Sequence, residues 1–140
     1  MDIARKSLLR DLILATERND FEHVKKLLDL GLEADEVDEI SHQTALFSAA
    51  CNGHVELTKF LLSKVRHPDS SEFGGATPLA YVIHGLGERP SGEKQDRLMS
   101  IIHLLLGAGA NPNAGSDKHQ TPLVLSRAYK MTDIETILDG

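Results

Sequence analysis

Apolar residues recur along the chain at helical spacing, in short segments that turn-forming residues separate. A representative segment is TALFSAACNGHVELTKFLL, at residues 44–62. Thr44 is a typical N-cap for a short helix of small residues, and Gly53 favours the end of that helix because glycine adopts positive φ at little cost. A second helix is predicted from about Val55 to Lys64, with its apolar residues at the spacing of one helical face. The segment therefore predicts two helices joined by a tight turn.

The same pattern returns along the chain at a regular interval. Thr44, Thr77 and Thr121 each begin a Thr-x-Leu sequence, and the intervals between them are 33 and 44 residues, so the second is longer by 11. The sequence LLDLGLEAD at residues 27–35 also resembles LLGAGANPN at residues 105–113. A repeat of this length, with two helices in each unit, predicts a stacked array. We expect four units, at about residues 1–37, 38–70, 71–114 and 115–140.

The 11 extra residues fall in the third unit, at roughly residues 85–97. Three glycines and Pro90 in this segment predict a loop that protrudes between the two helices of the unit. Ser91 is positioned to cap a lengthened second helix. A solvated loop of this length costs little entropy, whereas loops also frequently contact partners. The sequence leaves both interpretations open.

These units resemble the ankyrin repeat, whose pattern runs roughly G-x-T-P-L-H-x-A-A-x-x-G-H-x-E-I-V-K-L-L-L-x-x-G-A-D-V-N. Residues 42–62 match this pattern well, and residues 75–79 match its beginning. The resemblance implies an all-α solenoid of four stacked helix-turn-helix repeats with β-turn fingers, in a single domain over residues 1–140. Three other residues stand where the family usually has the His that follows Thr-Pro-Leu: Phe47, Ala80 and Val124.

Cys51 and His54 lie close enough in the sequence to be a nucleophile with its base, or two metal ligands. The repeat explains them without chemistry, because residues 53–54 align with the inter-helix turn and Cys51 with a variable position. No Asp or Asn is placed by the sequence to orient His54, and the seven histidines show no zinc-ligand spacing. We therefore predict no enzyme, no metal and no cofactor. The alternative is a reactive, partly exposed thiol at Cys51.

Composition narrows the classes of partner. The chain has 15 basic and 21 acidic residues, and a net charge of −6 argues against nucleic-acid binding, which needs clustered Lys and Arg. No apolar run has the length of a membrane span. One cysteine cannot form an internal disulfide, which favours a reducing, cytoplasmic setting. Bacterial effectors often carry such repeats, so the host cytosol is the alternative location.

The resemblance implies a non-catalytic module that binds a partner protein through the concave groove of finger tips and first helices. The module is either free-standing or the N-terminal part of a longer effector or regulator, and we expect a monomer. The alternatives are self-assembly through the same face and, third, a Cys/His enzyme. Exposed aromatics are the usual anchors of interfaces, so Phe73 and Tyr129 are expected to contribute more to binding than to folding. Family position predicts these partner-binding residues: Arg18, Ile40, Gln43, Asn52, Phe73, His84, Lys118 and Tyr129.

Overall fold

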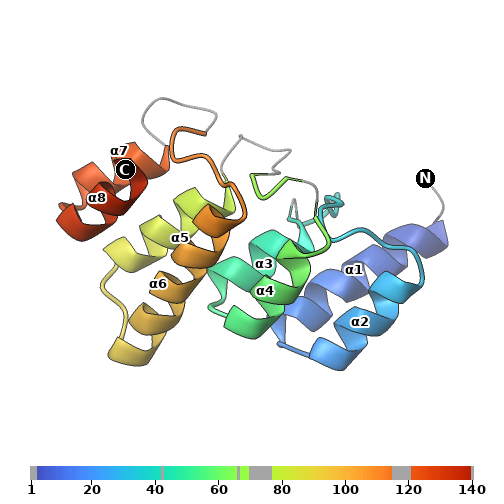
Figure 1. Ribbon diagram of the computed structural model, residues 1–140. Coiled ribbons are helices and arrows are strands. Elements are labelled where there is room, and N and C mark those ends of the chain that lie inside the picture. Colours follow the sequence, from blue (N-terminus) through green and yellow to red (C-terminus); the bar gives the residue numbers. More distant parts are fainter. Residues whose placement is uncertain (1–2, 42, 66, 70–76, 115–120, 140) are drawn as a thin grey trace.

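The computed structural model describes residues 3–41, 43–65, 67–69, 77–114 and 121–139 of the chain. Over this part of the chain eight α-helices follow one another and no strand is formed. The helices come in pairs that lie side by side along the molecule (Figure 1), so the predicted all-α array of four helix pairs is confirmed. The helices are α1 (Ile3–Glu17), α2 (Phe21–Asp29), α3 (Ala45–Cys51), α4 (Val55–Leu62), α5 (Pro78–Gly87), α6 (Gly92–Gly107), α7 (Pro122–Ala128) and α8 (Thr132–Asp139).

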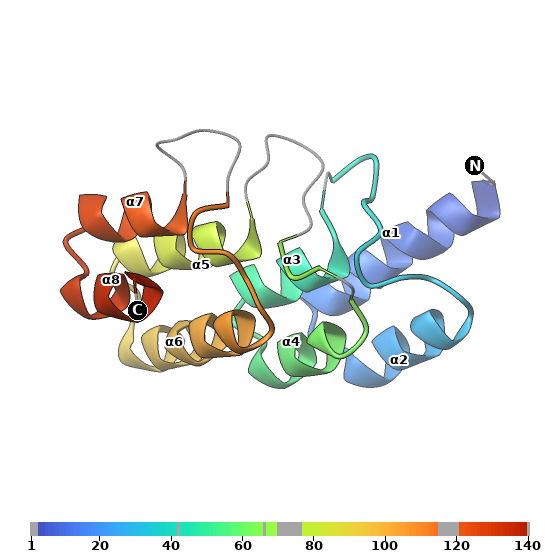
Figure 2. The same cartoon turned by 45° about the horizontal axis from the view of Figure 1, so that its top comes forward.

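Two rows of helices build the array, as Figure 2 shows. The first helices α1, α3, α5 and α7 form one row, and the second helices α2, α4, α6 and α8 form the other. Each first helix packs against its own second helix and against the next first helix along the row. A pair inside the array is therefore covered on both sides by its neighbours, as in other stacked repeats.

The three repeated threonines begin equivalent helices, as predicted. The hydroxyl oxygen of Thr44, Thr77 and Thr121 accepts a hydrogen bond from the backbone N–H three residues further on, at 3.0 to 3.2 Å. Pro78 and Pro122 stand at the next position, where a backbone N–H group would have no acceptor within the helix. These caps fix where α3, α5 and α7 start.

The leucines of the first two Thr-x-Leu sequences lie in the core, and Leu123 of the third is half-buried against it. Leu46 and Leu79 are at most 1% exposed, and Leu12 at the equivalent place in α1 is fully buried. Ala49 and Ala50 of α3 are also fully buried. Small side chains at these positions allow the neighbouring helices to approach closely, so that the interior reaches the density of a packed core.

The 11 extra residues of the third unit form helix, and the predicted protruding loop is wrong. α5 has 10 residues where α3 has 7, and α6 has 16 where α4 has 8, so the gains of three and eight account for the whole excess. Only residues 88–91 lie between α5 and α6. Ser91 stands at the N-cap of α6 as predicted, although its side chain makes no capping hydrogen bond.

Two glycines that the sequence suggested as loop formers, Gly85 and Gly87, lie inside α5. A Cβ atom at Gly85 would be 3.6 Å from the Leu98 side chain of α6. Leu86 and Leu98 are both buried, at 8% and 1% exposure. The burial of these leucines between α5 and α6 offsets the cost of about 1 kcal/mol that a glycine adds to a helix.

Three ion pairs attach the connection between the first two units to α1. Three basic residues of α1 each pair with an acidic residue of this connection: Arg5 with Glu36, Lys6 Nζ with Glu39 Oε2 at 3.1 Å, and Arg10 Nε with Asp38 Oδ2 at 3.3 Å. Asp38 also accepts hydrogen bonds from the Ser41 N–H and hydroxyl groups, at 3.1 and 2.8 Å. Burial alone would raise the pKa of Asp38, but these hydrogen bonds and the charge of Arg10 outweigh it and lower the pKa below its ordinary value of 3.8.

A second contact joins the connections that follow the second and third units. The Asn111 N–H donates to both carboxylate oxygens of Asp69, at 3.2 and 3.0 Å. Burial raises the pKa of Asp69, and it outweighs the opposite effects of this hydrogen bond and of the charge on His67. The tips of the predicted β-turn fingers fall on residues 70–76 and 115–120, which lie outside the described residues.

We expect Asp38→Asn to lower the free energy of unfolding at neutral pH by about 1–3 kcal/mol, because asparagine keeps the shape but loses the charge-assisted hydrogen bonds. The folded-state pKa of Asp38 is depressed. Its contribution is therefore fully present above 3.8 and is lost as the pH falls through the lower folded value. Urea unfolding of variant and parent at neutral and at acidic pH measures this difference, which should shrink on acidification.

Glu39→Gln is the matched control, because the Glu39 side chain is 64% exposed and its pair with Lys6 lies at the surface. Such exposed pairs contribute at most about 1 kcal/mol. A difference between Asp38→Asn and the parent that stays constant or grows at low pH would contradict this account of Asp38.

Candidate functional site

Exposed apolar and aromatic side chains gather on the row of first helices. Leu14 of α1 and Tyr81 of α5 stand two residues after the buried leucines of their helices and are 41% and 47% exposed. His84 of α5 is also exposed, whereas Phe47 of α3 and Tyr129 at the end of α7 are half-buried. We call the surface made by Leu14, Phe47, Tyr81, His84 and Tyr129 the first-helix face.

Aromatic rings connect neighbouring helices across the first-helix face. The ring of Phe47 in α3 meets that of Tyr81 in α5 edge-on, with centroids 4.7 Å apart. The ring of His84 in α5 meets that of Tyr129, which follows α7, with centroids 5.7 Å apart. Tyr81 and His84 are three residues apart in one helix and therefore lie on the same side of it. The four rings form a row across α3, α5 and α7.

A chain of polar contacts orders one end of this row. The Tyr129 hydroxyl oxygen lies 2.6 Å from His84 Nδ1, and His84 Nε2 lies 3.4 Å from Glu88 Oε1. An ionised carboxylate can only accept, so the tautomer that contacts Glu88 carries its hydrogen on Nε2. His84 Nδ1 then accepts a hydrogen bond from the Tyr129 hydroxyl. The donor hydrogens of both side chains are thus used inside the cluster.

Tyr129 also packs directly on α5. A Cβ atom at Gly87 would lie only 2.7 Å from three carbon atoms of the Tyr129 ring, so the ring occupies the space that a side chain would need. Tyr129 is half-buried. The residue therefore helps to hold α7 on α5. That Tyr129 contributes more to partner binding than to folding stays a prediction.

The other predicted partner-binding residues are spread over the molecule. Arg18 is exposed just after α1, and Asn52 caps the end of α3 with its side-chain amide 2.7 Å from the Ser48 carbonyl. The backbone carbonyl of Gln43 accepts a hydrogen bond from the Asp38 N–H at 2.9 Å. Of the predicted set, the structure brings together His84 and Tyr129.

The remaining predicted residues are Ile40, Phe73 and Lys118. Ile40 is 74% exposed and lines an apolar pocket of about 290 Å³ with Ile3 and Leu9, at the α1 end of the array. Phe73 and Lys118 fall outside the described residues. The sequence reasoning missed Leu14, Phe47, Tyr81 and Glu88. The repeat register could not have found Tyr81, because the same position of α3 is Ser48, which is buried.

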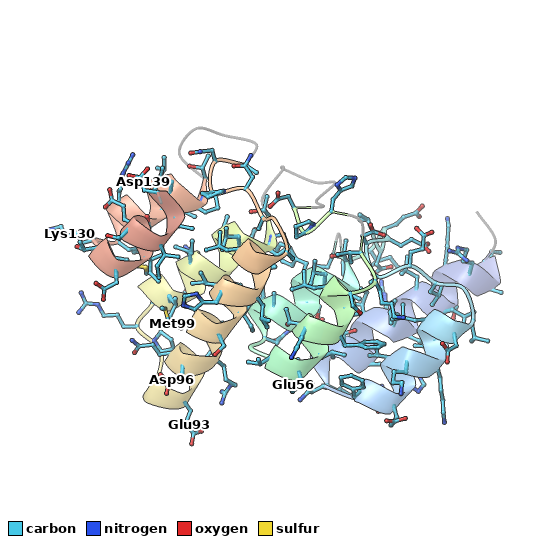
Figure 3. All side chains as sticks on the ribbon, viewed as in Figure 1. Glu56, Glu93, Asp96, Met99, Lys130 and Asp139 are labelled. Atoms are coloured by element: carbon cyan, nitrogen blue, oxygen red, sulfur yellow. The ribbon has the colours of Figure 1, made fainter. Side chains whose placement is uncertain are left out.

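A second hollow results from the longer helices of the third unit. It has a volume of about 490 Å³ and lies between α6 and the turn that joins α7 to α8. Met99 and Lys130, both labelled in Figure 3, line it together with Met131 and Gln95. On the other side of the extension, Arg97 lies beside the turn between α3 and α4, 3.5 Å from where a Cβ atom of Gly53 would be.

Cys51 and His54 do not form a catalytic pair. Burial raises the pKa of the Cys51 thiol to about 12, so the thiol is protonated at neutral pH. His54 Nε2 is 2.9 Å from the backbone carbonyl oxygen of Glu17, which indicates that the imidazole donates to the end of α1. Among the described residues, no group of three or more His, Cys, Asp or Glu side chains could hold a metal ion.

A match to a family model decides how this array is classified. The model described as ankyrin repeats, in three copies, matches residues 12–88, which is more than half of the chain. The chain belongs to the ankyrin repeat family. Within this ankyrin array, none of the helices that the structure describes combines the length and apolar character of a membrane span.

Two known proteins are similar to this chain. A solved ankyrin repeat domain from Acinetobacter baumannii AYE superimposes with a TM-score of 0.74 at 29% identity, covering 91% of this chain and 61% of that one. Serine/threonine-protein kinase 12 of Arabidopsis thaliana is 37% identical over 75 residues. That match covers 54% of this ankyrin chain but only 16% of the kinase, so the chain spans a small part of that relative.

We expect Cys51 to react with iodoacetamide at neutral pH more slowly than a free thiol, because the thiolate is the reactive form and burial disfavours it. Mass spectrometry of the intact protein during the reaction measures the rate. The same thiol in urea, where the chain is unfolded, is the control. Stoichiometric alkylation of the folded protein faster than that control would indicate an activated thiolate.

We expect Gly87→Ala to destabilise the fold by about 1–3 kcal/mol, because the new Cβ must displace the Tyr129 ring. Gly107→Ala is the matched control, since α6 leaves the space around Gly107 open and alanine there should stabilise the helix by up to about 1 kcal/mol. Urea unfolding gives both values. Equal effects of the two substitutions would show that Tyr129 does not depend on the glycine.

Proposed function

We propose that this chain is a non-catalytic interaction module that binds a partner protein through the first-helix face, which corresponds to the concave side of the array. Membership of the ankyrin repeat family supports protein binding in general, because such repeats generally bind proteins. The observation that carries the proposal is the row of four rings beside exposed Leu14. Large amphipathic aromatics are enriched among the residues that dominate protein interfaces.

The arrangement of the rings supports an interface more than it supports an ordinary surface. Tyr81 is steadied by its contact with Phe47, and Tyr129 by Gly87 and His84. Side chains that already hold their position lose little conformational entropy when a partner binds. The proposed binding surface extends from this face to the predicted residues at helix ends and in the connections: Arg18, Ile40, Gln43, Asn52, Phe73 and Lys118.

Composition supports a cytoplasmic setting for the module. A single cysteine and a net charge of −6 are consistent with a cytoplasmic protein whose partner is another protein rather than a nucleic acid. This proposal requires neither a cofactor nor a metal. We expect a monomer, whether the module stands alone or forms part of a longer effector or regulator.

One observation favours self-association as the second candidate function. Ile3 and Ile40 are 84% and 74% exposed beside the apolar pocket at the α1 end of the array. Light scattering over a series of protein concentrations separates the two functions. A mass that grows with concentration, and that Ile40→Ala returns to the monomer, would favour self-association over binding of a different protein.

Two substitutions of leucine test the proposed face. Leu14→Ala changes the first-helix face, whereas Leu30→Ala changes an exposed leucine outside it, at the end of α2. We expect Leu14→Ala and Tyr81→Ala to weaken capture of partner proteins from cell lysate, since truncating an interface anchor costs about 2 kcal/mol, or roughly thirtyfold in affinity. Leu30→Ala should leave capture unchanged.

Stability separates a lost interface from a lost fold. Leu61 is fully buried, and Leu61→Ala should cost about 2–5 kcal/mol of unfolding free energy. Tyr81→Ala should cost less than about 1 kcal/mol, because nearly half of that side chain is exposed. Capture that survives both Leu14→Ala and Tyr81→Ala in the folded protein would show that the first-helix face is not the binding surface.

A further inference from the structure

One end of the first-helix face carries a polar cluster at the contact between α5 and the end of α7. Tyr81, His84 and Glu88 follow one another along one side of α5, at spacings of three and four residues, and Tyr129 approaches them from the end of α7. We call these four side chains the α5 cluster. Glu88 is its outermost member, with 71% of its side chain exposed.

The cluster presents acceptors and aromatic surface to its surroundings. His84 places its Nε2 side toward Glu88 and its Nδ1 side toward the Tyr129 hydroxyl, so both ring nitrogens are engaged. The Tyr129 hydroxyl uses its one hydrogen toward His84 and keeps lone pairs for an incoming group. The Glu88 carboxylate can accept several hydrogen bonds and receives one weak contact from His84 at 3.4 Å. An incoming polar group must therefore be a donor.

Charge narrows the identity of that donor. Within the described part of the chain, His84 is the one group at ion-pair distance from Glu88. Arg127 of α7 is engaged by Glu135 at 2.8 Å, and Lys130 lines the separate pocket with Met99. Among the described residues, Glu88 therefore forms no ion pair with a Lys or Arg side chain. The whole chain adds to the attraction for a cation, because its net charge is −6.

We propose that the α5 cluster is a subsite for an arginine side chain of the partner protein, an inference that rests on the proposed binding through the first-helix face. The guanidinium group combines the three properties that the cluster complements. It is always charged, it donates in a planar fork that fits the carboxylate of Glu88, and it stacks on aromatic rings such as those of Tyr81 and Tyr129. Lysine offers the charge without the fork or the planar face.

The test uses a phage-displayed library of random peptides panned on the immobilised chain. Peptides that bind the parent and not Tyr81→Ala report on the first-helix face. We expect these peptides to share an arginine. One of them is then synthesised with that arginine and with citrulline, which keeps the shape but removes the charge, and both are titrated by calorimetry.

Two variants assign the arginine to its site. Glu88→Gln should weaken the arginine peptide about fivefold, as expected for an exposed charge pair, and should leave the citrulline peptide unchanged. Glu93→Gln is the matched control, because Glu93 of α6 (Figure 3) is 94% exposed and lies outside the cluster, and it should change neither affinity. Circular dichroism confirms that both variants are folded.

The possible outcomes separate the two proposals. The arginine subsite would be overturned by peptides that depend on Tyr81 but share no arginine. It would also be overturned if replacing the arginine with citrulline, or Glu88→Gln, left the affinity unchanged. Either result would leave the proposed function in place. A shared lysine in place of arginine would also overturn the arginine subsite. Peptides that bind the parent and Tyr81→Ala equally would instead contradict binding through the first-helix face itself.

Discussion

The structure depends on contacts between neighbouring helix pairs, because no single pair can bury its own apolar side chains. α3 shows the requirement most clearly: Leu46, Ala49 and Ala50 are all buried, yet the helix has only seven residues. An isolated helix of that length would not be stable in water. It forms because Thr44 caps its start and because α1, α4 and α5 surround it. The fold therefore depends on the burial of apolar side chains between one helix pair and the next.

This constraint leaves one face of the first helices free for other chemistry. Stacking uses the sides of α5 that meet α3, α6 and α7, where Leu79 and Ile83 are fully buried. Tyr81 is 47% exposed although its ring meets Phe47 of α3, and the Glu88 side chain is 71% exposed. We therefore expect their identity to affect the stability of the array little. A repeat array can therefore change what it binds without changing how it folds.

Much of the fold could be predicted because its determinants are local. The capping threonines and the buried leucines recur at fixed spacing, and each acts within its own helix. The longer α5 and α6 could not be predicted in the same way, since Gly85 and Gly87 look like breaks in a sequence. Their suitability for a helix depends on Leu98 and Tyr129, which are distant in the chain and close in space.

The candidate site was predictable to the extent that the repeat register assigns positions. Register alone placed His84 and Tyr129 on the same surface, and the structure finds them in contact at 2.6 Å. It could not show that Phe47 meets Tyr81, because ring contacts depend on the offset between neighbouring helices. The sequence places Glu88 in a loop. In the structure Glu88 directly follows α5, one helical turn after His84.

The extended third pair has a consequence for how the chain folds. In a linear array, folding begins where a pair is most stable by itself and then spreads to its neighbours. α5 and α6 are longer than the helices of the pairs on either side, and α6 alone contributes four fully or nearly buried side chains. We therefore expect this hairpin to nucleate the array, to exchange its amide hydrogens last, and to leave α7 and α8 as the pair that opens first.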